Sequence, residues 1–366
     1  MSRSQASRTT LLAVAEAAGV SVATVSKVVN DRSDVAPATR ARVAALLAEY
    51  NYVARGQSTQ VTGLDLAFDS MDNPNNLEMI RGATAEAAAE DVEVVVGVAP
   101  RLDDTARWAR WAQRVAGPGR AGLILVTTRL TPAHYEPFAR VGARIVLVDP
   151  VSVPHSGLPS IGVTDFAGGL AATEHLLGLG HRRIAMIQGR PEAASSRARL
   201  HGYQAALSTA GIAVDPDLIE RGDFLIGPSR MAALRLLDLA EPPTAVFAAS
   251  DGQALGVIEA ARQRGLRVPE DLSVVGFDGV PVLQYSSPPL TTVRQPFAEM
   301  GRAAVQSLLR LASGRDLASR HVELATELIV RASCAPPPAL PPVPPTSATP
   351  STPTPPTPTP TPTPKP

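Results

Sequence analysis

The sequence TLLAVAEAAGVSVATVSKVVN, residues 10–30, decides how the N-terminal part of this chain is interpreted. Apolar residues recur at helical spacing on both sides of Gly19, in one segment that ends near Ala18 and a second that begins near Val22. Gly19 can enter left-handed backbone space without a Cβ penalty, and Ser21 can cap the second segment. The pattern therefore predicts two short amphipathic helices joined by a tight turn, which is a helix-turn-helix.

A third helix is expected directly after this pair. Pro37 suits a first helical turn, and apolar residues follow on one face as far as Tyr50. The second helix presents small side chains and Lys27 away from the core, as a helix that enters the DNA major groove does. We predict an all-α DNA-binding head over residues 1–52. Two ordinary core helices of a larger domain would explain the pattern less well, because it stands at the N-terminus with a matching third helix.

Charge and composition agree with this division. The 366-residue chain has no net charge, but residues 1–60 contain seven arginines and lysines and four acidic residues, so a head of +3 precedes a remainder of −3. Cys334 is the single cysteine, which excludes an intramolecular disulfide and a cysteine-based metal cluster. The histidines show no metal-ligand spacing, so we expect no metal and no cofactor. No leader and no bilayer-length apolar run is found, and a cytoplasmic protein without a membrane partner is expected.

The body of the chain, residues 63–334, alternates short β-branched runs with helical segments, which predicts parallel sheets with helices on both faces. Two such series imply two doubly wound lobes, with a ligand cleft where the carboxyl ends of their strands face each other. The sequence HVELATELIV is expected to form one closing strand. We assign lobe 1 to about residues 63–160 and 291–320, and lobe 2 to about 161–290 and 321–334.

The two remaining segments have different compositions. Residues 53–62 are polar, contain Gly56 and show no apolar period, so they are expected to be a short linker. Residues 335–366 hold 16 of the 35 prolines, and this segment is expected to be a disordered tail because it cannot build a core.

Five phrases of the sequence are characteristic when taken together and in order: AEAAGVSVATVSKVVN, TEHLLGLGHRRIAMIQG, RARLHGYQAAL, ASDGQALGVIEAARQRGLRVPEDLSVVGFDG and PPLTTVRQPFAEMG. Over residues 9 to about 332 the chain resembles the lactose/galactose-repressor (LacI/GalR) family of bacterial transcription regulators. The resemblance implies a helix-turn-helix head on a periplasmic-binding-protein-like body. It also implies a homodimer that reads a pseudo-palindromic double-stranded operator, and a small effector, a sugar or oligosaccharide, that controls operator affinity from the cleft.

The resemblance also assigns residues to DNA. Val22 and Ala23 occupy the base-reading start of the second helix, where apolar side chains can contact thymine methyl groups but cannot make bidentate hydrogen bonds. Lys27 stands where an arginine usually reads or steers. The linker has no leucine to wedge into the minor groove, so no such lever is expected, although Arg55 could reach that groove. The implied DNA-binding residues are Thr10, Ser21, Val22, Ala23, Thr24, Ser26, Lys27, Asn30, Thr39 and Arg55.

In the cleft the resemblance points to Arg199 and Asp278 as the main polar clamps. Arginine and carboxylate can bind vicinal hydroxyls through charge-assisted hydrogen bonds, while an aromatic face covers the apolar side of a sugar ring. The other implied effector-binding residues are Arg101, Asp149, Ser195, Phe224, Ser250 and Gln295. Asp165 and Asp251 are expected instead to cap the helices that they begin.

Two other classes of function would fit parts of the sequence. A sugar-binding transport receptor would share the two-lobed body, but it needs export and leaves the head unexplained. An enzyme would need a nucleophile or a metal set, and none is found: residues 117–122, GPGRAG, spell a dinucleotide fingerprint but precede a strand, and no serine lies in a nucleophile elbow. We therefore predict no catalytic residue. Activation or corepressor-dependent repression stays open, because the sequence does not fix the sign of the coupling.

Overall fold

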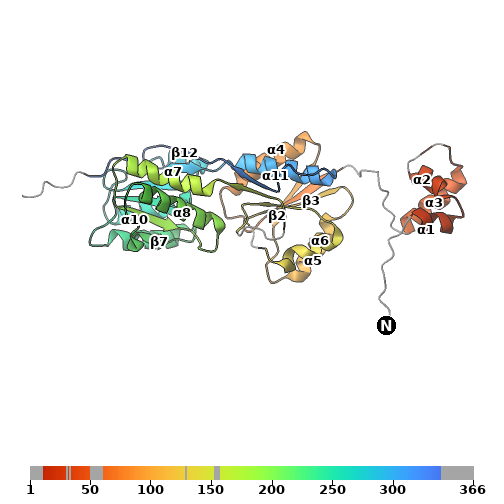
Figure 1. Ribbon diagram of the computed structural model, residues 1–366, viewed down its shortest axis with the longest axis horizontal. Helices are drawn as coiled ribbons and strands as arrows, with labels where there is room; N and C mark the ends of the chain where they lie inside the picture. Colours follow the sequence, from red (N-terminus) through yellow and green to blue (C-terminus); the bar gives the residue numbers. More distant parts are fainter. Residues whose placement is uncertain are drawn as a thin grey trace, which may run out of the picture.

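The computed structural model describes residues 11–29, 32, 34–49, 61–127, 130–151 and 157–338. These ranges form a three-helix head and a body of two α/β lobes (Figure 1). The predictions made for Thr10, Asn30, Arg55, linker residues 53–60 and tail residues 339–366 lie outside the described part of the chain.

The head consists of α1 (Leu11–Ala18), α2 (Val22–Val29) and α3 (Pro37–Glu49). α1 and α2 meet at 107°, and Gly19 between them has φ 63°, as the turn requires. Their shared core holds Val14, Ala15, Ala18, Val25 and Val43, all buried. The predicted helix-turn-helix is confirmed. Within the described residues no single helix is long and apolar enough to cross a bilayer; only the bent pair α1 and α2 has that length and composition jointly.

The first lobe is a six-stranded sheet in the order β11-β5-β4-β3-β1-β2, and every neighbouring pair is parallel. Helices α4 and α11 cover one face and α5 and α6 the other (Figure 1), so alternate strand residues enter two separate apolar cores. The strands are β1 (Gly63–Phe68), β2 (Glu93–Val98), β3 (Arg120–Val126), β4 (Ile145–Val148), β5 (Ser160–Val163) and β11 (His321–Leu324). The helices are α4 (Asn76–Ala89), α5 (Thr105–Val115), α6 (Pro132–Val141) and α11 (Phe297–Ala312).

Helices α4 and α11 come from distant parts of the sequence and pack closely enough for their backbones to touch. A Cβ at Gly82 would overlap the carbonyl of Ala298, and one at Gly301 would overlap the carbonyl of Met79. Glycine is needed at both positions because no side chain fits between the helices. The contact fixes the C-terminal α11 onto the first lobe.

The second lobe repeats the arrangement, with the strand order β12-β10-β9-β8-β6-β7; only β12 runs antiparallel to its neighbour. Helices α7 and α8 cover one face, and α9 and α10 the other. The strands are β6 (Ile184–Gln188), β7 (Ile219–Arg221), β8 (Ala245–Ala248), β9 (Ser273–Asp278), β10 (Thr291–Arg294) and β12 (Glu327–Ile329). The helices are α7 (Asp165–Gly178), α8 (Ala194–Thr209), α9 (Ile226–Leu237) and α10 (Asp251–Gln263), with short 3₁₀ turns η1 (Pro216–Leu218) and η2 (Pro281–Tyr285).

The lobe boundaries differ from those expected. β5 and β11 belong to the first sheet and β10 to the second, so the chain changes lobe after Val163, after Arg294 and after Leu324. HVELATELIV is therefore two strands in two sheets. The prediction was wrong because alternation along a strand shows that a strand forms and not which sheet it joins.

The connections that follow Val163 and Leu324 are hydrogen-bonded to each other. The Thr326 amide donates to the Thr164 hydroxyl at 3.0 Å, and the two hydroxyls lie 3.0 Å apart. The Thr164 amide in turn donates to the Leu324 carbonyl at 3.0 Å. The connecting segments thus form a hydrogen-bonded pair between the lobes.

The body also extends slightly beyond its expected end at residue 334. The Ala335 amide donates to the Ser273 hydroxyl at 3.0 Å, and the Ala335 carbonyl lies 2.9 Å from Nε2 of His181. His181 is buried and also contacts Thr244 through Nδ1. Ala335 is therefore part of the second lobe and not of the tail, because these hydrogen bonds hold it there.

Candidate functional site

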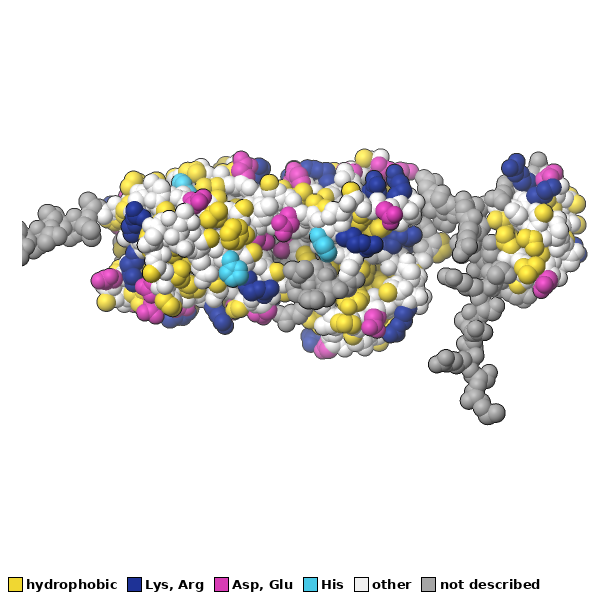
Figure 2. Space-filling view, viewed as in Figure 1, with side chains coloured by type: hydrophobic (Ala, Val, Ile, Leu, Met, Phe, Trp, Pro, Cys, Tyr) yellow, Lys and Arg dark blue, Asp and Glu magenta, His cyan; other side chains and the backbone are white. Residues whose placement is uncertain are grey.

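The outward face of α2 is the candidate DNA-binding surface of the head. Val22, Ala23 and Lys27 are exposed on it, and Figure 2 shows apolar side chains on the visible face of the head. The Lys27 amine lies 2.7 Å from a carboxylate oxygen of Asp34, which follows α2. This exposed ion pair costs little to break, so Lys27 can exchange Asp34 for a DNA phosphate.

The other predicted DNA contacts surround this face. Ser21 caps α2 as predicted, because its hydroxyl accepts the Thr24 amide at 3.1 Å. Thr24, Ser26 and Thr39 are half-buried at the edges of the face. These assignments to DNA remain predictions.

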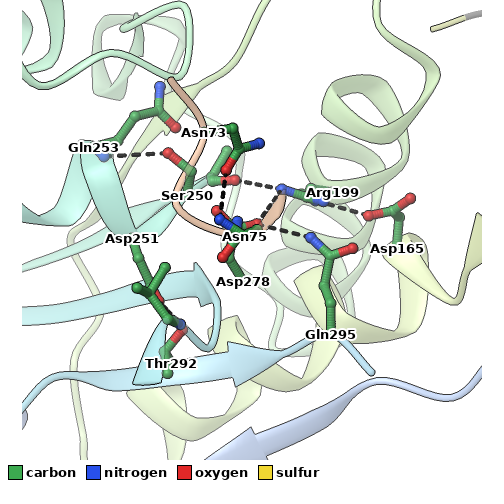
Figure 3. A network of polar contacts seen from close by, with 12 residues as sticks. Asn73, Asn75, Asp165, Arg199, Ser250, Asp251, Gln253, Asp278, Thr292 and Gln295 are labelled. Carbon is green, nitrogen blue, oxygen red and sulfur yellow. Dashed lines mark hydrogen bonds and ion pairs between the residues drawn. The ribbon is translucent and has the colours of Figure 1, made fainter. Parts of the chain in front are cut away.

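Arg199 is the centre of the polar network between the lobes (Figure 3). It projects from α8, is only 3% exposed, and donates from Nε to Asp165 at 2.8 Å and from Nη1 to the Ala249 carbonyl at 2.6 Å. Nη1 also lies 3.7 Å from Oδ1 of Asp278, at the end of β9. One guanidinium is therefore held by two carboxylates and one carbonyl.

Two aromatic rings fix the orientation of Arg199. The guanidinium carbon lies 3.7 Å from the ring centre of Phe277 and 5.9 Å from that of Phe224. Both distances fit cation–π contacts. Phe224 lies directly over Gly189, where any Cβ would overlap the ring. The predicted aromatic residue is thus next to the predicted arginine.

Asp278 is held from three directions. Gln295 donates to Oδ1 from Nε2 at 2.7 Å, and its backbone amide donates to the Asp278 carbonyl at 2.9 Å. Asn75, in the loop that leads into α4 of the first lobe, also hydrogen-bonds the carboxylate. Asp278 has φ 118°, a conformation that L-residues rarely adopt. Its side chain lies in the network, where groups from both lobes contact it.

Asp149 brings a third carboxylate from the first lobe. It follows β4, has φ 45°, and hydrogen-bonds the side chain of Thr127 at the end of β3. Thr127 also has a positive φ of 48°. Five of the six described non-glycine residues with positive φ lie at such strand ends or loops near the network, namely Thr127, Asp149, Asp223, Phe224 and Asp278. Strain of this kind is concentrated at ligand sites.

The charges in the network are unequal. Three carboxylates surround one guanidinium, and all are withdrawn from solvent. Burial and repulsion by Asp165 raise the pKa of Asp149 to about 7, and burial raises the pKa of Asp278 to about 6 although Arg199 opposes the rise. Burial alone would lower the pKa of Arg199, but Asp165 and Asp278 hold it above its ordinary value. Near neutral pH Asp149 is therefore partly protonated, whereas Asp278 is mostly ionised.

The expected roles of Asp165 and Asp251 were wrong. Thr164 is the N-cap of α7 and Ser250 that of α10, where its hydroxyl accepts the Gln253 amide at 3.2 Å. Asp165 binds Arg199, and Asp251 accepts from the Val280 amide at 2.7 Å and the Thr292 hydroxyl at 2.6 Å. Both carboxylates therefore contact neighbouring elements and do not cap their own helices.

Of the remaining residues predicted to bind the effector, Ser195 lies near the network and Arg101 does not. Ser195 stands one turn before Arg199 on the same face of α8 and is half-buried. Arg101 does not join the network: its side chain is 85% exposed and pairs with Asp103 at 3.2 Å. Sequence reasoning missed Asn75, Thr127 and Phe277. The strand-end rule could have pointed to Thr127 and Phe277, but nothing local marks the loop amide of Asn75.

Comparison with known proteins agrees with this geometry. The family model for bacterial regulatory proteins of the lacI family matches residues 10–54, and that for a periplasmic binding protein-like domain matches residues 173–334. The HTH-type transcriptional repressor CytR of Escherichia coli (strain K12) is 34% identical over 338 residues, 90% of this chain and 98% of that protein. The chain belongs to the lacI family. The resemblance found in the sequence is thereby confirmed, as is the fold of head and two-lobed body.

Other members of the lacI family match at similar levels. The transcriptional regulator CelR of Thermobifida fusca is 33% identical over 89% of this chain and 98% of its own length. The solved structure of a CelR–cellobiose complex has a TM-score of 0.68 at 31% identity, covering 89% of this chain and all of that one. The lac repressor dimer bound to operator and the anti-inducer ONPF has a TM-score of 0.66 at 29% identity, with 90% and 100% covered. These relatives are transcription regulators.

Proposed function

We propose that this protein is a transcriptional repressor that binds a pseudo-palindromic operator as a homodimer and is released by a saccharide bound between its lobes. The observation that carries the proposal is the Arg199 network. A guanidinium, carboxylates from both lobes and an aromatic ring converge at one place, on a chain that also contains a DNA-reading head. Such a protein acts in the bacterial cytoplasm, on the nucleoid.

The proposed mechanism follows from the position of the network. A saccharide that binds Arg199 and Asp278 in the second lobe and Asp149 in the first brings the two lobes together. The connecting segments at Thr164 and Thr326 transmit this movement, and α11 shifts with the first lobe. The ligand changes operator affinity only as far as it prefers one arrangement of the dimer.

The first lobe offers a surface for the proposed dimer. β2 is an edge strand, and its Val95, Val96 and Val98 are 44%, 37% and 50% exposed. An exposed apolar edge strand is an aggregation risk unless a partner covers it. A second copy with the same edge satisfies this requirement through a symmetric contact, which also sets the spacing of two heads. The lac repressor is a dimer in its operator complex.

The cellobiose in the CelR complex supports a saccharide as effector. The opposite sign of coupling, in which the ligand strengthens operator binding, is the second candidate. It uses the same site, and only the response to ligand separates the two.

The test is selection of bound sequences from random duplex DNA with the full-length protein, with and without a panel of mono- and disaccharides. We expect an enriched palindrome whose binding weakens when one saccharide is present. Enrichment that appears only with a saccharide would establish corepression instead. A protein that enriches no sequence, and binds every duplex alike, contradicts the proposal.

A further inference from the structure

Asn75 is a buried amide whose carbonyl oxygen has no hydrogen-bond partner among the described residues. It is the N-cap residue of α4, but its side chain makes no capping hydrogen bond and points instead to Asp278 (Figure 3). The residue is only 5% exposed, and no group in the described part of the chain hydrogen-bonds its Oδ1. An Asn at an N-cap position usually accepts a helix amide, so this residue gives up its ordinary role.

Gln295 repeats this arrangement from the other side of Asp278. It is also 5% exposed and donates from Nε2 to Asp278, and its buried Oε1 has no partner within the ranges that the structure describes. The side-chain amides of Asn75 and Gln295 thus both donate to the Asp278 carboxylate, and their carbonyl oxygens remain as two hydrogen-bond acceptors. A buried acceptor without a partner is unfavourable, and a ligand that donates to it removes that cost.

The ionic groups add to this excess of acceptors. Asp149, Asp165 and Asp278 outnumber Arg199 by three to one, and Arg199 already donates to Asp165 and to the Ala249 carbonyl. Arg101, which could have added a second cation, is exposed and paired with Asp103. An anionic ligand would meet net negative charge in a site of low dielectric, whereas hydroxyl groups would find acceptors.

We propose that the site selects an uncharged polyhydroxylated saccharide over its phosphorylated form, and that Asn75 is the specificity-determining residue of the first lobe. Its Oδ1 accepts a hydrogen bond from one ligand hydroxyl while Nδ2 keeps its bond to Asp278. The same amide thereby joins ligand, first lobe and second lobe. This inference rests on the proposed saccharide-responsive function and names the ligand class and the contact.

The experiment is isothermal titration calorimetry of the full-length chain with glucose, ribose, cellobiose and glucose 6-phosphate. The tightest neutral binder is then compared with its monodeoxy derivatives on the wild type and on Asn75→Leu. The control variant is Asn76→Leu, which makes the same change in the next residue, where the amide donates to the Ser70 carbonyl at 2.7 Å and not to Asp278. Circular dichroism verifies that both variants are folded.

We expect Asn75→Leu to weaken binding of the neutral saccharide about tenfold and Asn76→Leu to change it less than about twofold. For one monodeoxy derivative the effect of Asn75→Leu should vanish, because the hydroxyl that Asn75 binds is already missing. Glucose 6-phosphate should bind at least about tenfold more weakly than glucose, a comparison that needs no variant.

An equal loss for the parent saccharide and every derivative would show that Asn75 only shapes the loop and would overturn its assigned contact. Binding of glucose 6-phosphate as tight as that of glucose would overturn the ligand class. If no neutral saccharide binds the wild type, the saccharide-responsive function itself fails and this inference fails with it.

Discussion

The two lobes have the same strand order and the same pairs of covering helices, yet they contribute unequally to the site. The second lobe supplies Arg199 and its two aromatic neighbours, together with Asp165 and Asp278. The first lobe supplies Asp149 and Asn75. The two lobes thus share one architecture but have different roles in the site. The second lobe holds a preorganised binding surface, and the first lobe provides groups on loops, of which Asn75 already contacts Asp278.

The difference has a physical basis. In the second lobe, stacking on Phe277 and bonds to Asp165 and Ala249 fix the guanidinium before any ligand arrives. Such preorganisation lowers the entropy cost of binding. The groups of the first lobe sit on loops after β1, β3 and β4, so they follow the movement of that lobe. Affinity should therefore depend mainly on the second lobe and signal transmission on the first.

The largest expected effect comes from removing the centre of the second-lobe surface. Arg199→Ala leaves Asp165 and Asp278 buried without their cation, and breaking such a pair typically costs about 3–5 kcal/mol. We expect saccharide affinity to fall at least about 100-fold, with operator binding retained but no longer responsive to ligand. Calorimetry measures the first quantity and fluorescence anisotropy of labelled operator the second.

A matched control lies on the same helix. Arg197 is exposed and its guanidinium donates only to the Pro191 and Glu192 carbonyls among its described partners, so Arg197→Ala should leave saccharide affinity within about twofold of the wild type. Equal losses for the two variants would mean that the second lobe is not the main binding surface.

An intermediate effect is expected from pH, through the first-lobe carboxylate. Asp149 faces Asp165, Asp278, Arg199 and Thr127, and burial raises its pKa to about 7. Hydroxyl donors bind the ionised carboxylate, so saccharide affinity should rise as pH increases, by about tenfold between pH 5.5 and pH 8. Titrations at fixed ionic strength measure this slope. Asp149→Asn should flatten it, leaving only the smaller contribution of Asp278, whose pKa is raised to about 6.

The stability of the ligand-free protein should change with pH in the opposite direction to its saccharide affinity. Both carboxyls have folded-state pKa values above the ordinary 3.8, so between pH 4 and 7 the folded protein binds more protons than the unfolded chain. The free energy of unfolding of the ligand-free body should therefore decrease as pH rises through this window. Denaturant unfolding at several pH values checks it, and an increase over the same window would contradict the raised pKa values.

The helices and several site residues could be predicted from the sequence, but the sheet that each strand joins could not. A helix was expected to begin at Asp165, and α7 (Asp165–Gly178) begins there, because apolar period and flanking residues act locally. Arg199, Asp278 and Gln295 were expected in one site, and the structure brings them together. The sheet that each short strand joins was assigned wrongly for β5, β10 and β11, because strand pairing is decided by distant contacts.

The same limit applies to the carboxylates. Asp165 and Asp251 both stand where a capping residue would, and only tertiary packing shows that Asp165 binds Arg199 while Asp251 binds the Val280 amide and Thr292. Asn75 is the N-cap residue of α4 in the first lobe, but its side chain does not cap that helix and instead hydrogen-bonds Asp278 of the second lobe. A residue at a helix start can cap the helix or reach across the fold, and the local sequence does not distinguish the two.

The smallest effect should come from the segments that join the two lobes. Thr326→Val preserves shape but removes the hydroxyl that lies 3.0 Å from the Thr164 hydroxyl, while the Thr326 amide keeps its bond to Thr164. The same hydroxyl also donates to the Thr164 carbonyl at 3.2 Å, so the substitution removes both contacts. A neutral hydrogen bond contributes about 1 kcal/mol, and the remaining amide bond preserves part of the connection. We expect saccharide affinity to change less than about twofold, and the ratio of operator affinities without and with ligand to fall about threefold.

Thr209→Val supplies the same chemical change away from the connections, since the Thr209 hydroxyl donates to the Ala205 carbonyl within α8. Paired anisotropy and calorimetry on both variants separate coupling from affinity. If Thr326→Val weakened saccharide binding as strongly as it weakened the operator response, the connections would belong to the binding surface. The division between a binding lobe and a sensing lobe would then have to be redrawn to include them.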